Sequence, residues 1–253
     1  QRIKNTTLLD KHKDLANSIQ VMYEEAFFNI INSSAPYDSS DNLCIAGGCG
    51  ANSVANGKIT SKTKFNKVYI HPAPGDAGGA LGAALEVWHK LEKVRCSPMR
   101  TAYLGPKISN DFINKFFKEA ETLRLLSESN SKILKLGDSI LSDEDKLLNL
   151  IAEAISEGKV IGWFEGEMEW GPRALGHRSI LSDPRKANMK DILNLKIKKR
   201  ESFRPFAPAI LKEKASDWFD INSEHDLDVP FMMKVYPIYS EKRALIPAVC
   251  HID

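Results

Sequence analysis

Apolar residues recur with a helical period near the start of this 253-residue chain. They stand three or four residues apart, at Leu15, Ile19, Met22, Ala26 and Ile30. This spacing predicts an amphipathic helix from roughly Asp14 to Ile31, with these residues on its apolar side. The polar residues that follow, up to Asn42, predict a loop.

A short apolar run, Leu43 to Ala46, leads directly into Gly47-Gly48-Cys49-Gly50, and a second helix is expected to begin near Ala51. Strand, glycine turn and helix in this order bring backbone N–H groups close to a phosphate or a ribose. Many such turns only allow a strand and a helix to pack closely. The motif by itself leaves both interpretations open.

A further strand is predicted at Val68 to Ile70, before the sequence HPAPGDAGGALGAAL. Asp76 stands where a turn passes into a helix whose first turns are almost all Gly and Ala, which lets a backbone or a ligand approach closely. An Asp in this place most often caps the helix, but it could also ligate a metal or bind a nucleotide-linked cation. His71 could join a metal site, although a single His beside Pro72 is more often structural.

The stretch from Glu92 to Pro106 has no clear period, and we place a domain boundary there. The elements expected beyond it are a helix at Asn110–Leu126, a helix begun by a capping box of Ser142 and Asp145 and ended at Gly158, a strand at Val160–Trp163, a helix at Pro184–Leu195, a strand at Phe206–Leu211, a helical turn at Ala215–Phe219 and a strand at Phe231–Val235. Alternating strands and helices predict an α/β or α+β fold with mixed sheets.

Composition argues against several classes of function. The net charge of +2 provides no overall field for nucleic acid or an anionic membrane. No run of about 18 apolar residues predicts a membrane span, and the polar amino terminus lacks a signal-peptide core, so we expect a cytoplasmic protein. The cysteines, Cys44, Cys49, Cys96 and Cys250, form no C-x-x-C pair, which argues against a zinc site made of cysteines alone. Cys44 lies in an apolar run, as expected of a reduced thiol, and a catalytic thiol at Cys49 is the less favoured alternative.

Basic residues gather between Glu165 and Pro208, in segments rich in Gly and Pro. They include Arg173, Arg178, Arg185, Lys198, Lys199, Arg200 and Arg204, which alternate with the aromatics Trp170, Phe203 and Phe206. Guanidinium groups held on rigid turns present planar donor forks that match phosphate or carboxylate oxygens. A pocket for a multiply charged anion is therefore favoured over the alternative of structural arginines that cap strand ends.

The same stretch, EWGPRALGHRSILSDPR followed by KIKKRESFRPFAPAIL, resembles the carbamoyltransferase family that includes nodulation protein U and antibiotic O-carbamoyltransferases. Upstream, LCIAGGCGANSVANGKI and VYIHPAPGDAGGALGAAL are similar to the same family in the same order, and TAYLGPKIS is similar to its passage into a second domain. The resemblance runs from about Leu43 to the carboxyl end.

The resemblance implies two domains. Residues 1–96 would be the second half of an actin-like ATPase-type (RNase H-like) domain, and residues 97–253 a YrdC-like domain with a twisted mixed sheet, truncated at its carboxyl terminus. It implies that the YrdC-like domain combines carbamoyl phosphate and ATP into carbamoyl adenylate. The actin-like domain, carrying a divalent metal (Fe or Mg) in the complete protein, would then transfer the carbamoyl group to a hydroxyl-bearing small-molecule acceptor.

The resemblance also assigns roles to residues. Arg173, Lys198 and Arg204 would be catalytic, and together with Arg178, Ser179 and Arg200 they would bind carbamoyl phosphate and nucleotide by holding phosphate and carbamoyl oxygens. Gly47, Gly48 and Asn52 would lie along the nucleotide, and Asp76 would be a metal ligand, in contrast to the capping role that its local sequence favours. Arg185 and Lys199 are expected to face solvent.

Two departures from the family pattern lead us to expect a fragment. The metal-binding histidines and first phosphate loop of the family do not occur before Gln1, and a single carboxylate at Asp76 cannot complete a metal site. The glycine and arginine that follow in the family are missing after Asp253. Alternative functions are an RNA-binding or tRNA-modification module of YrdC-like fold, which the low net charge argues against, and a non-catalytic interaction domain.

Overall fold

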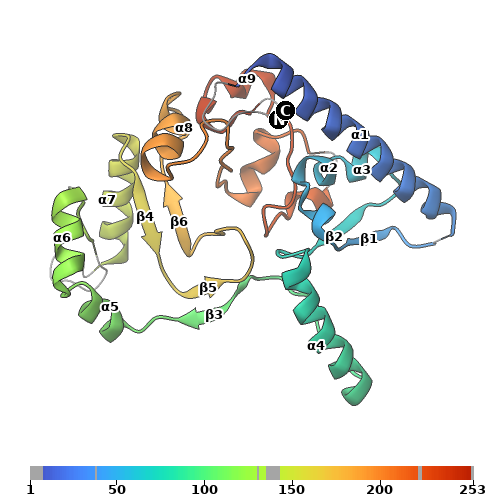
Figure 1. The fold of residues 1–253 in the computed structure, drawn as a ribbon, viewed down its shortest axis with the longest axis horizontal. Coiled ribbons are helices and arrows are strands. Elements are labelled where there is room, and N and C mark those ends of the chain that lie inside the picture. The colour runs from blue at the N-terminus through green and yellow to red at the C-terminus, as the bar shows by residue number, and fades with distance from the viewer. Residues whose placement is uncertain (1–7, 38, 130, 135–142, 222–223, 252–253) are drawn as a thin grey trace. The chain divides into compact units, whose positions relative to one another are not determined.

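The computed structural model of the protein describes residues 8–37, 39–129, 131–134, 143–221 and 224–251 (Figure 1). Backbone contacts divide the chain into two compact units. The first unit comprises Gln1–Pro98, Ala209–Arg243 and Cys250–Asp253, and the second comprises Met99–Pro208 and Ala244–Val249. The chain leaves the first unit close to the boundary expected after residue 96. The segment Ala209–Arg243 then clusters with the first unit, and the assignment of actin-like and YrdC-like folds to the two units stays a prediction.

In the first unit, helix α1 (Asp10–Ser34) precedes two strands that pair in parallel, β1 (Asn42–Ile45) and β2 (Lys67–Ile70). The connection between the strands holds the glycine turn, a 3₁₀ turn (Gly48–Ala51) and two short helices, α2 (Ser53–Gly57) and α3 (Ile59–Lys62). The predicted first helix, both strands and the helix after the glycine turn are therefore confirmed.

Helix α1 packs with a different face from the one that its apolar period suggested. Phe28 and Ile31 are buried in the core of the first unit with Ile59 and Phe65. Most of the predicted stripe is exposed, including Leu15, Ile19, Met22 and Ile30. The helix thus carries a second apolar row, and its bulky aromatic residues, which have more surface to bury, are the ones that face the core.

Helix α4 (Asp76–Glu92) follows β2, as predicted, and has no buried residue. It runs away from β1 and β2 in Figure 1. The N-cap residue is Gly75, which has no side chain to cap the helix. Asp76 is therefore the first helical residue and not the cap that its local sequence favoured. Its carboxylate still lies at the end of the helix where a negative charge is favourable.

The segment Ala209–Arg243 contains two 3₁₀ turns (Lys212–Asp217 and Glu224–Leu227) and helix α9 (Ser240–Arg243). The strand predicted at Phe231–Val235 is wrong: this stretch docks against helix α2. The N–H group of Val235 donates to the carbonyl oxygen of Ser53 (3.0 Å), and Asn56 Nδ2 donates to the carbonyl oxygen of Met233 (2.9 Å). Phe231 and Met233 are both buried, which explains the alternating pattern. The hydrogen bonds of Met233 and Val235, however, go to a helix and not to a neighbouring strand.

The second unit contains two antiparallel pairs of strands. Strand β3 (Tyr103–Lys107) pairs with β5 (Glu167–Glu169), and β4 (Ile161–Phe164) pairs with β6 (Arg178–Leu181). Each of the three sheets in the described part of the chain has two strands, one sheet being parallel and two antiparallel. A fold of mixed α and β structure is thus confirmed, whereas the larger sheets of an actin-like or a YrdC-like domain stay a prediction.

The helices of the second unit follow the prediction in part. The single helix expected from Asn110 is split into α5 (Asn110–Phe116) and α6 (Ala120–Ser129). Helix α7 (Glu144–Ser156) is capped by Asp143, and the predicted Ser142 lies outside the described residues. The helix ends as predicted at Gly158, whose φ of +89° suits glycine at this position. Its residues Leu147 and Ile151 pack against Ile161 and Trp163 of β4.

The helix expected at Pro184–Leu195 forms only in its second half, as α8 (Met189–Asp191) and a π-helical turn (Ile192–Ile197). Met189 and Leu193 are buried with Ala248 and contact Phe206. The strand predicted at Phe206–Leu211 is wrong, because these residues are assigned to no strand. Pro208 has no N–H group to donate to a ladder, which is consistent with this result.

Candidate functional site

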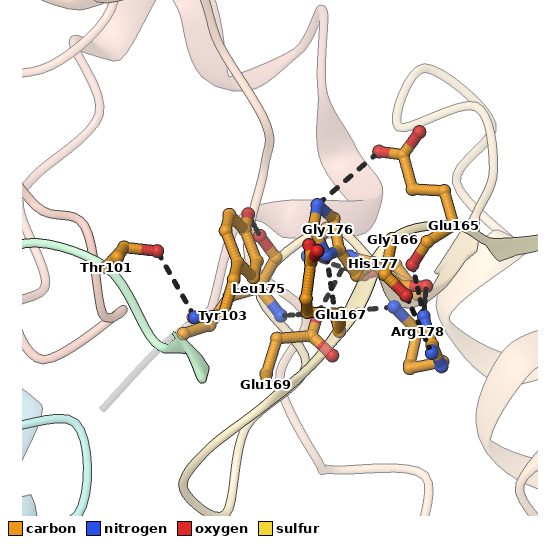
Figure 2. Close-up of polar contacts among 11 residues, drawn as sticks. Thr101, Tyr103, Glu165, Gly166, Glu167, Glu169, Leu175, Gly176, His177 and Arg178 are labelled. Atoms are coloured by element: carbon orange, nitrogen blue, oxygen red, sulfur yellow. Dashed lines mark hydrogen bonds and ion pairs between the residues drawn. The ribbon is translucent and has the colours of Figure 1, made fainter. Parts of the chain in front are cut away.

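The loop between β5 and β6 carries Arg173 and is closed by Glu169. The Oε1 atom of Glu169 accepts hydrogen bonds from the N–H groups of Leu175 (3.0 Å), His177 (2.7 Å) and Arg178 (3.2 Å), as Figure 2 shows. Burial by itself would raise the pKa of this carboxyl group, but its hydrogen bonds with backbone groups outweigh burial and lower the pKa. Glu169 therefore remains ionised at neutral pH.

Tyr103 of β3 supports the same loop from another strand (Figure 2). Its hydroxyl group donates to the carbonyl oxygen of Leu175 (2.7 Å), and its ring stacks on the imidazole of His177 with 3.6 Å between the ring centroids. Burial, and then the negative charges of Glu169 and Glu165, raise the pKa of Tyr103, so the hydroxyl keeps its proton. Tyr103 can thus serve as a hydrogen-bond donor throughout the physiological range.

The imidazole of His177 has a defined orientation. Its Nδ1 atom lies 2.7 Å from the carbonyl oxygen of Glu167. Because a carbonyl oxygen can only accept, Nδ1 carries the hydrogen. The other nitrogen, Nε2, lies 3.9 Å from a carboxylate oxygen of Glu165.

Arg178 directs its guanidinium group at the backbone. It donates to the carbonyl oxygens of Glu165, Gly166 (3.2 Å) and His177 (2.9 Å), and it lies over the ring of Phe164. These bonds hold the turn between β4 and β5. A guanidinium group has five N–H donors, so the expected contact of Arg178 with a ligand stays a prediction alongside this structural role.

Arg173 lies in the middle of the loop and is half-buried. Burial lowers the pKa of its guanidinium group, which nevertheless stays charged at neutral pH. Ser179, at the start of β6, accepts a hydrogen bond from the N–H group of Gly176 (3.0 Å). Its hydroxyl hydrogen can still be donated to a ligand.

The second basic segment is organised around Asn194, which is fully buried. Its Nδ2 atom donates to the carbonyl oxygens of Ser202 (3.1 Å) and Arg204 (2.9 Å), and its Oδ1 atom accepts from Nε of Arg200 (2.6 Å). Arg200 also lies over the ring of Phe206. Asn194 could not be recognised from the sequence, because nothing in its local sequence distinguishes it from an ordinary helix residue.

Four further basic residues of this stretch are exposed. Lys198 and Lys199 face solvent, and Arg204 pairs with Glu201 at 3.2 Å. Arg185 forms two hydrogen bonds of 2.8 Å with Asp183 and is itself exposed. All predicted phosphate-binding residues thus belong to the second unit, on two segments, and their convergence on one ligand stays a prediction.

The glycine turn of the first unit has an open surface. Gly47 has a φ of +93°, and a Cβ atom added to Gly47 or Gly48 would meet nothing within 4 Å. The side chain of Asn52 caps helix α2 by accepting from the N–H group of Ala55 (3.1 Å), and its amide also pairs with Gln20 (2.9 Å). Contact of this turn with a nucleotide stays a prediction.

No metal centre is formed by the described residues. Within them, no group of three or more His, Cys, Asp or Glu side chains could hold an ion, so Asp76 has no such companions there. The Nδ1 atom of His71 lies 3.0 Å from both backbone groups of Ala73, in keeping with a structural role. Cys44, like Cys49 and Cys96, is a free thiol. No described helix is long and apolar enough to cross a membrane.

Comparison with known proteins matches both ends of the chain to one family. The family model described as Carbamoyltransferase N-terminus matches residues 1–85, and the one described as Carbamoyltransferase C-terminus matches residues 152–253. The chain belongs to the carbamoyltransferase family. It is therefore related to transferases, and the resemblance expected from its motifs is confirmed.

Curated relatives of this carbamoyltransferase chain are considerably longer than it is. Protein sll1178 of Synechocystis sp. is 38% identical over 278 residues, covering 100% of this chain and 42% of that protein. Nodulation protein NolNO of Sinorhizobium fredii is 36% identical, covering 100% of this chain and 35% of that protein. Nodulation protein U of Rhizobium tropici is 33% identical, covering 84% and 32%. The chain thus spans less than half the length of these relatives.

Proposed function

We propose that the protein is part of an ATP-dependent O-carbamoyltransferase. In this proposal the second unit binds carbamoyl phosphate and ATP. Water hydrolyses carbamoyl phosphate to carbamate and phosphate, and a carbamate oxygen then attacks the α-phosphorus of ATP, which forms carbamoyl adenylate and releases pyrophosphate. The first unit then takes part in transferring the carbamoyl group to a hydroxyl group of a small-molecule acceptor. Membership of the carbamoyltransferase family supports the transfer chemistry.

The observation that carries the proposal is the half-buried guanidinium group of Arg173 on a loop whose closing end is fixed by hydrogen bonds. A cation on a preformed loop loses little conformational freedom when it binds an oxyanion. Partial burial reduces the competition from water, so a phosphate contact with Arg173 would be stronger than one with an exposed lysine. We propose that Arg173 binds the phosphate and carbamoyl oxygens, whose negative charge changes during the reaction.

Lys198, Arg200 and Arg204 are assigned to the same ligand as a second set of cations. The loop that holds them is shaped by the buried Asn194, which bonds to Arg200 and to the backbone of Arg204. Binding of phosphate and nucleotide groups depends almost entirely on such positioning and charge, since phosphoryl transfer requires little covalent chemistry from the protein. Arg178 and Ser179 would add hydrogen bonds from the first segment.

The proposed metal ion is not matched by a complete set of ligands in the described residues, because Asp76 is the only expected ligand. We therefore derive no step through a metal. Gly47, Gly48 and Asn52 are proposed to lie along the nucleotide, an assignment supported by the open surface of the turn.

Calorimetric titration with carbamoyl phosphate and a non-hydrolysable ATP analogue tests the proposal. Arg173→Ala should weaken carbamoyl phosphate binding by about 10- to 150-fold, corresponding to the roughly 1.5–3 kcal/mol of a hydrogen bond to a charged group. Arg124→Ala is the matched control, since Arg124 is an exposed arginine of helix α6 in the same unit and pairs with Glu128 one helical turn away. Equal affinity of the wild type and Arg173→Ala would show that the pocket is assigned wrongly.

A further inference from the structure

We propose that Glu169 and Tyr103 are positioning residues that hold the loop of residues 170–176 in the shape that presents Arg173 to a phosphate-bearing ligand. The proposal rests on the proposed function and assigns roles to two residues outside the predicted set of arginines, lysines and serine. Both residues act through the backbone of the loop, as the view in Figure 2 shows.

Glu169 gathers the far end of the loop onto a single oxygen atom. The three N–H donors belong to residues six, eight and nine positions further along the chain. A carboxylate can only accept hydrogen bonds, and bonds to an ionised acceptor are roughly twice as strong as neutral ones. The end of β5 and the start of β6 are thereby tied together around the loop.

Two consecutive residues support the loop at two points: Ala102, which directly precedes β3, and Tyr103, the first residue of β3. The carbonyl oxygen of Ala102 accepts from the N–H group of Trp170 (2.7 Å), at the start of the loop. The hydroxyl group of Tyr103 binds the carbonyl oxygen of Leu175, near its end. Both backbone groups of Leu175 are thus occupied, one by Tyr103 and one by Glu169.

Gly176 fits closely beneath the same tyrosine. Its φ is +128°, a conformation that side chains rarely adopt, and an added Cβ atom would lie 3.2 Å from the Tyr103 hydroxyl oxygen. The next residue, His177, stacks its ring on that of Tyr103 at an interplanar angle of 9°. The tyrosine therefore fixes the backbone by its hydroxyl group and the following side chain by its ring.

A catalytic acid or base role for Glu169 fits the structure less well than a positioning role. Its Oε1 atom is already bonded to three donors, and these bonds stabilise the ionised form. A group that keeps its charge in this way has no proton to give near neutral pH, and protonation of the carboxylate would weaken the bonds that close the loop. The effect of Glu169 on the ligand therefore passes through the conformation of residues 170–176.

The test compares Glu169→Leu with Glu169→Gln in the full chain. Glutamine keeps a neutral acceptor oxygen, whereas leucine removes the acceptor at similar volume. We expect Glu169→Leu to accelerate amide hydrogen exchange at Leu175, His177 and Arg178 at least tenfold by NMR, and to weaken carbamoyl phosphate binding at least tenfold by calorimetry. Glu169→Gln should restore both to within about threefold of the wild type.

A core variant separates positioning from general loss of stability. Ile151→Ala in helix α7 removes buried side-chain volume from the same unit, at a residue whose hydrophobic cluster includes Ile161 and Trp163 of β4. At a matched fall in Tm, it should leave the affinity for carbamoyl phosphate unchanged. Should Glu169→Leu fail to fold, Tyr103→Phe removes one hydrogen bond and keeps the ring, and it should weaken binding about threefold to tenfold.

The outcomes distinguish the two proposals. A folded Glu169→Leu or Tyr103→Phe protein with wild-type affinity overturns the positioning roles while leaving the proposed function intact. If the wild type binds neither carbamoyl phosphate nor inorganic phosphate, the proposed function fails and the positioning of Arg173 for a ligand fails with it. The exchange rates then still report whether Glu169 closes the loop.

Discussion

Replacing Lys234 by methionine is expected to destabilise the first unit by about 3–5 kcal/mol, the usual cost of leaving one member of a buried ion pair without its partner. The Nζ atom of Lys234 lies 2.5 Å from Oδ1 of Asp226, and only 6% and 2% of the two side chains is exposed. The other oxygen of Asp226 accepts from the hydroxyl group of Thr60 at 2.5 Å. This small buried network attaches the segment Ala209–Arg243 to helix α3.

Methionine has nearly the same length as lysine, so the substitution removes the charge while it leaves most of the packing in place. The carboxylate of Asp226 then remains buried without its cationic partner, beside the hydroxyl groups of Thr60 and Tyr236. For a chain of this size, the loss corresponds to a fall in Tm of roughly 6–20 °C. The double variant Lys234→Met, Asp226→Leu removes both charges and should recover most of the loss.

Thermal and urea unfolding followed by circular dichroism measure these effects. The matched control is Lys90→Met in helix α4, because Lys90 pairs with Glu86 at 2.9 Å while 72% and 63% of the two side chains is exposed. An exposed pair contributes about 0–1 kcal/mol, so the control should change stability little. Equal unfolding midpoints for Lys234→Met and Lys90→Met would refute the assignment of a buried, paired charge.

Two further predictions concern a glycine and a carboxylate. Gly57→Ala should destabilise the protein by about 3 kcal/mol or more in urea unfolding, because the new Cβ atom would lie 1.9 Å from the carbonyl oxygen of Val235. Gly79→Ala, where nothing lies within 4 Å, should instead stabilise helix α4 by about 0.5–1 kcal/mol. A Gly57→Ala protein more stable than Gly79→Ala would contradict this packing. Because folding lowers the pKa of Glu169, its ionisation stabilises the fold above the unfolded pKa of about 4.3 and loses this effect as pH falls through the folded value. The advantage of the wild type over Glu169→Gln in urea midpoint should therefore shrink on acidification below about pH 5, and an advantage independent of pH would exclude an ionised Glu169.

Local sequence rules predicted the elements that depend on local chemistry. The short apolar runs before the glycine turn and before helix α4 form β1 and β2. The stop of helix α7 at Gly158 follows from a residue that tolerates positive φ, and the N–H groups of Gly158 and Lys159 close the last turn by bonding to Ile155 and Ala154. In these cases the sequence neighbours of a residue are also its structural partners.

The same rules failed where the partner comes from a distant part of the chain. The period of Leu15 and Ile19 located helix α1 correctly but not its packed face, since a period does not say which apolar row meets the core. Phe231 and Met233 alternate in burial as strand residues do, yet the carbonyl oxygen of Met233 bonds to Asn56, 177 residues earlier. Hydrogen bonds between an extended segment and a distant helix leave no signal in the local sequence pattern of either one.

The basic residues of the candidate site were predicted from sequence motifs, and their roles stay predictions. The motifs located the basic loops, whereas the residues that shape them, Glu169, Tyr103 and Asn194, were not identified. Their contributions depend mainly on backbone N–H and C=O groups, which have the same chemistry in every residue. One usable signal was present: Glu169 is an acidic residue directly before a loop that is rich in Gly, Pro and Arg.

The partners of the basic residues indicate which of them a phosphate ligand can recruit. Arg178 uses its donors on carbonyl oxygens, and Arg185 is held by the buried carboxylate of Asp183, so moving either would leave polar groups unsatisfied. The side chain of Arg204 pairs with Glu201, in a pair where 54% and 48% of the side chains is exposed, and such pairs contribute about 0–1 kcal/mol. A dianion can displace Glu201 at little cost. Arg204 can therefore change partners on binding, whereas the loop that carries Arg173 is already shaped, and the two arginines would contribute to one ligand in different ways.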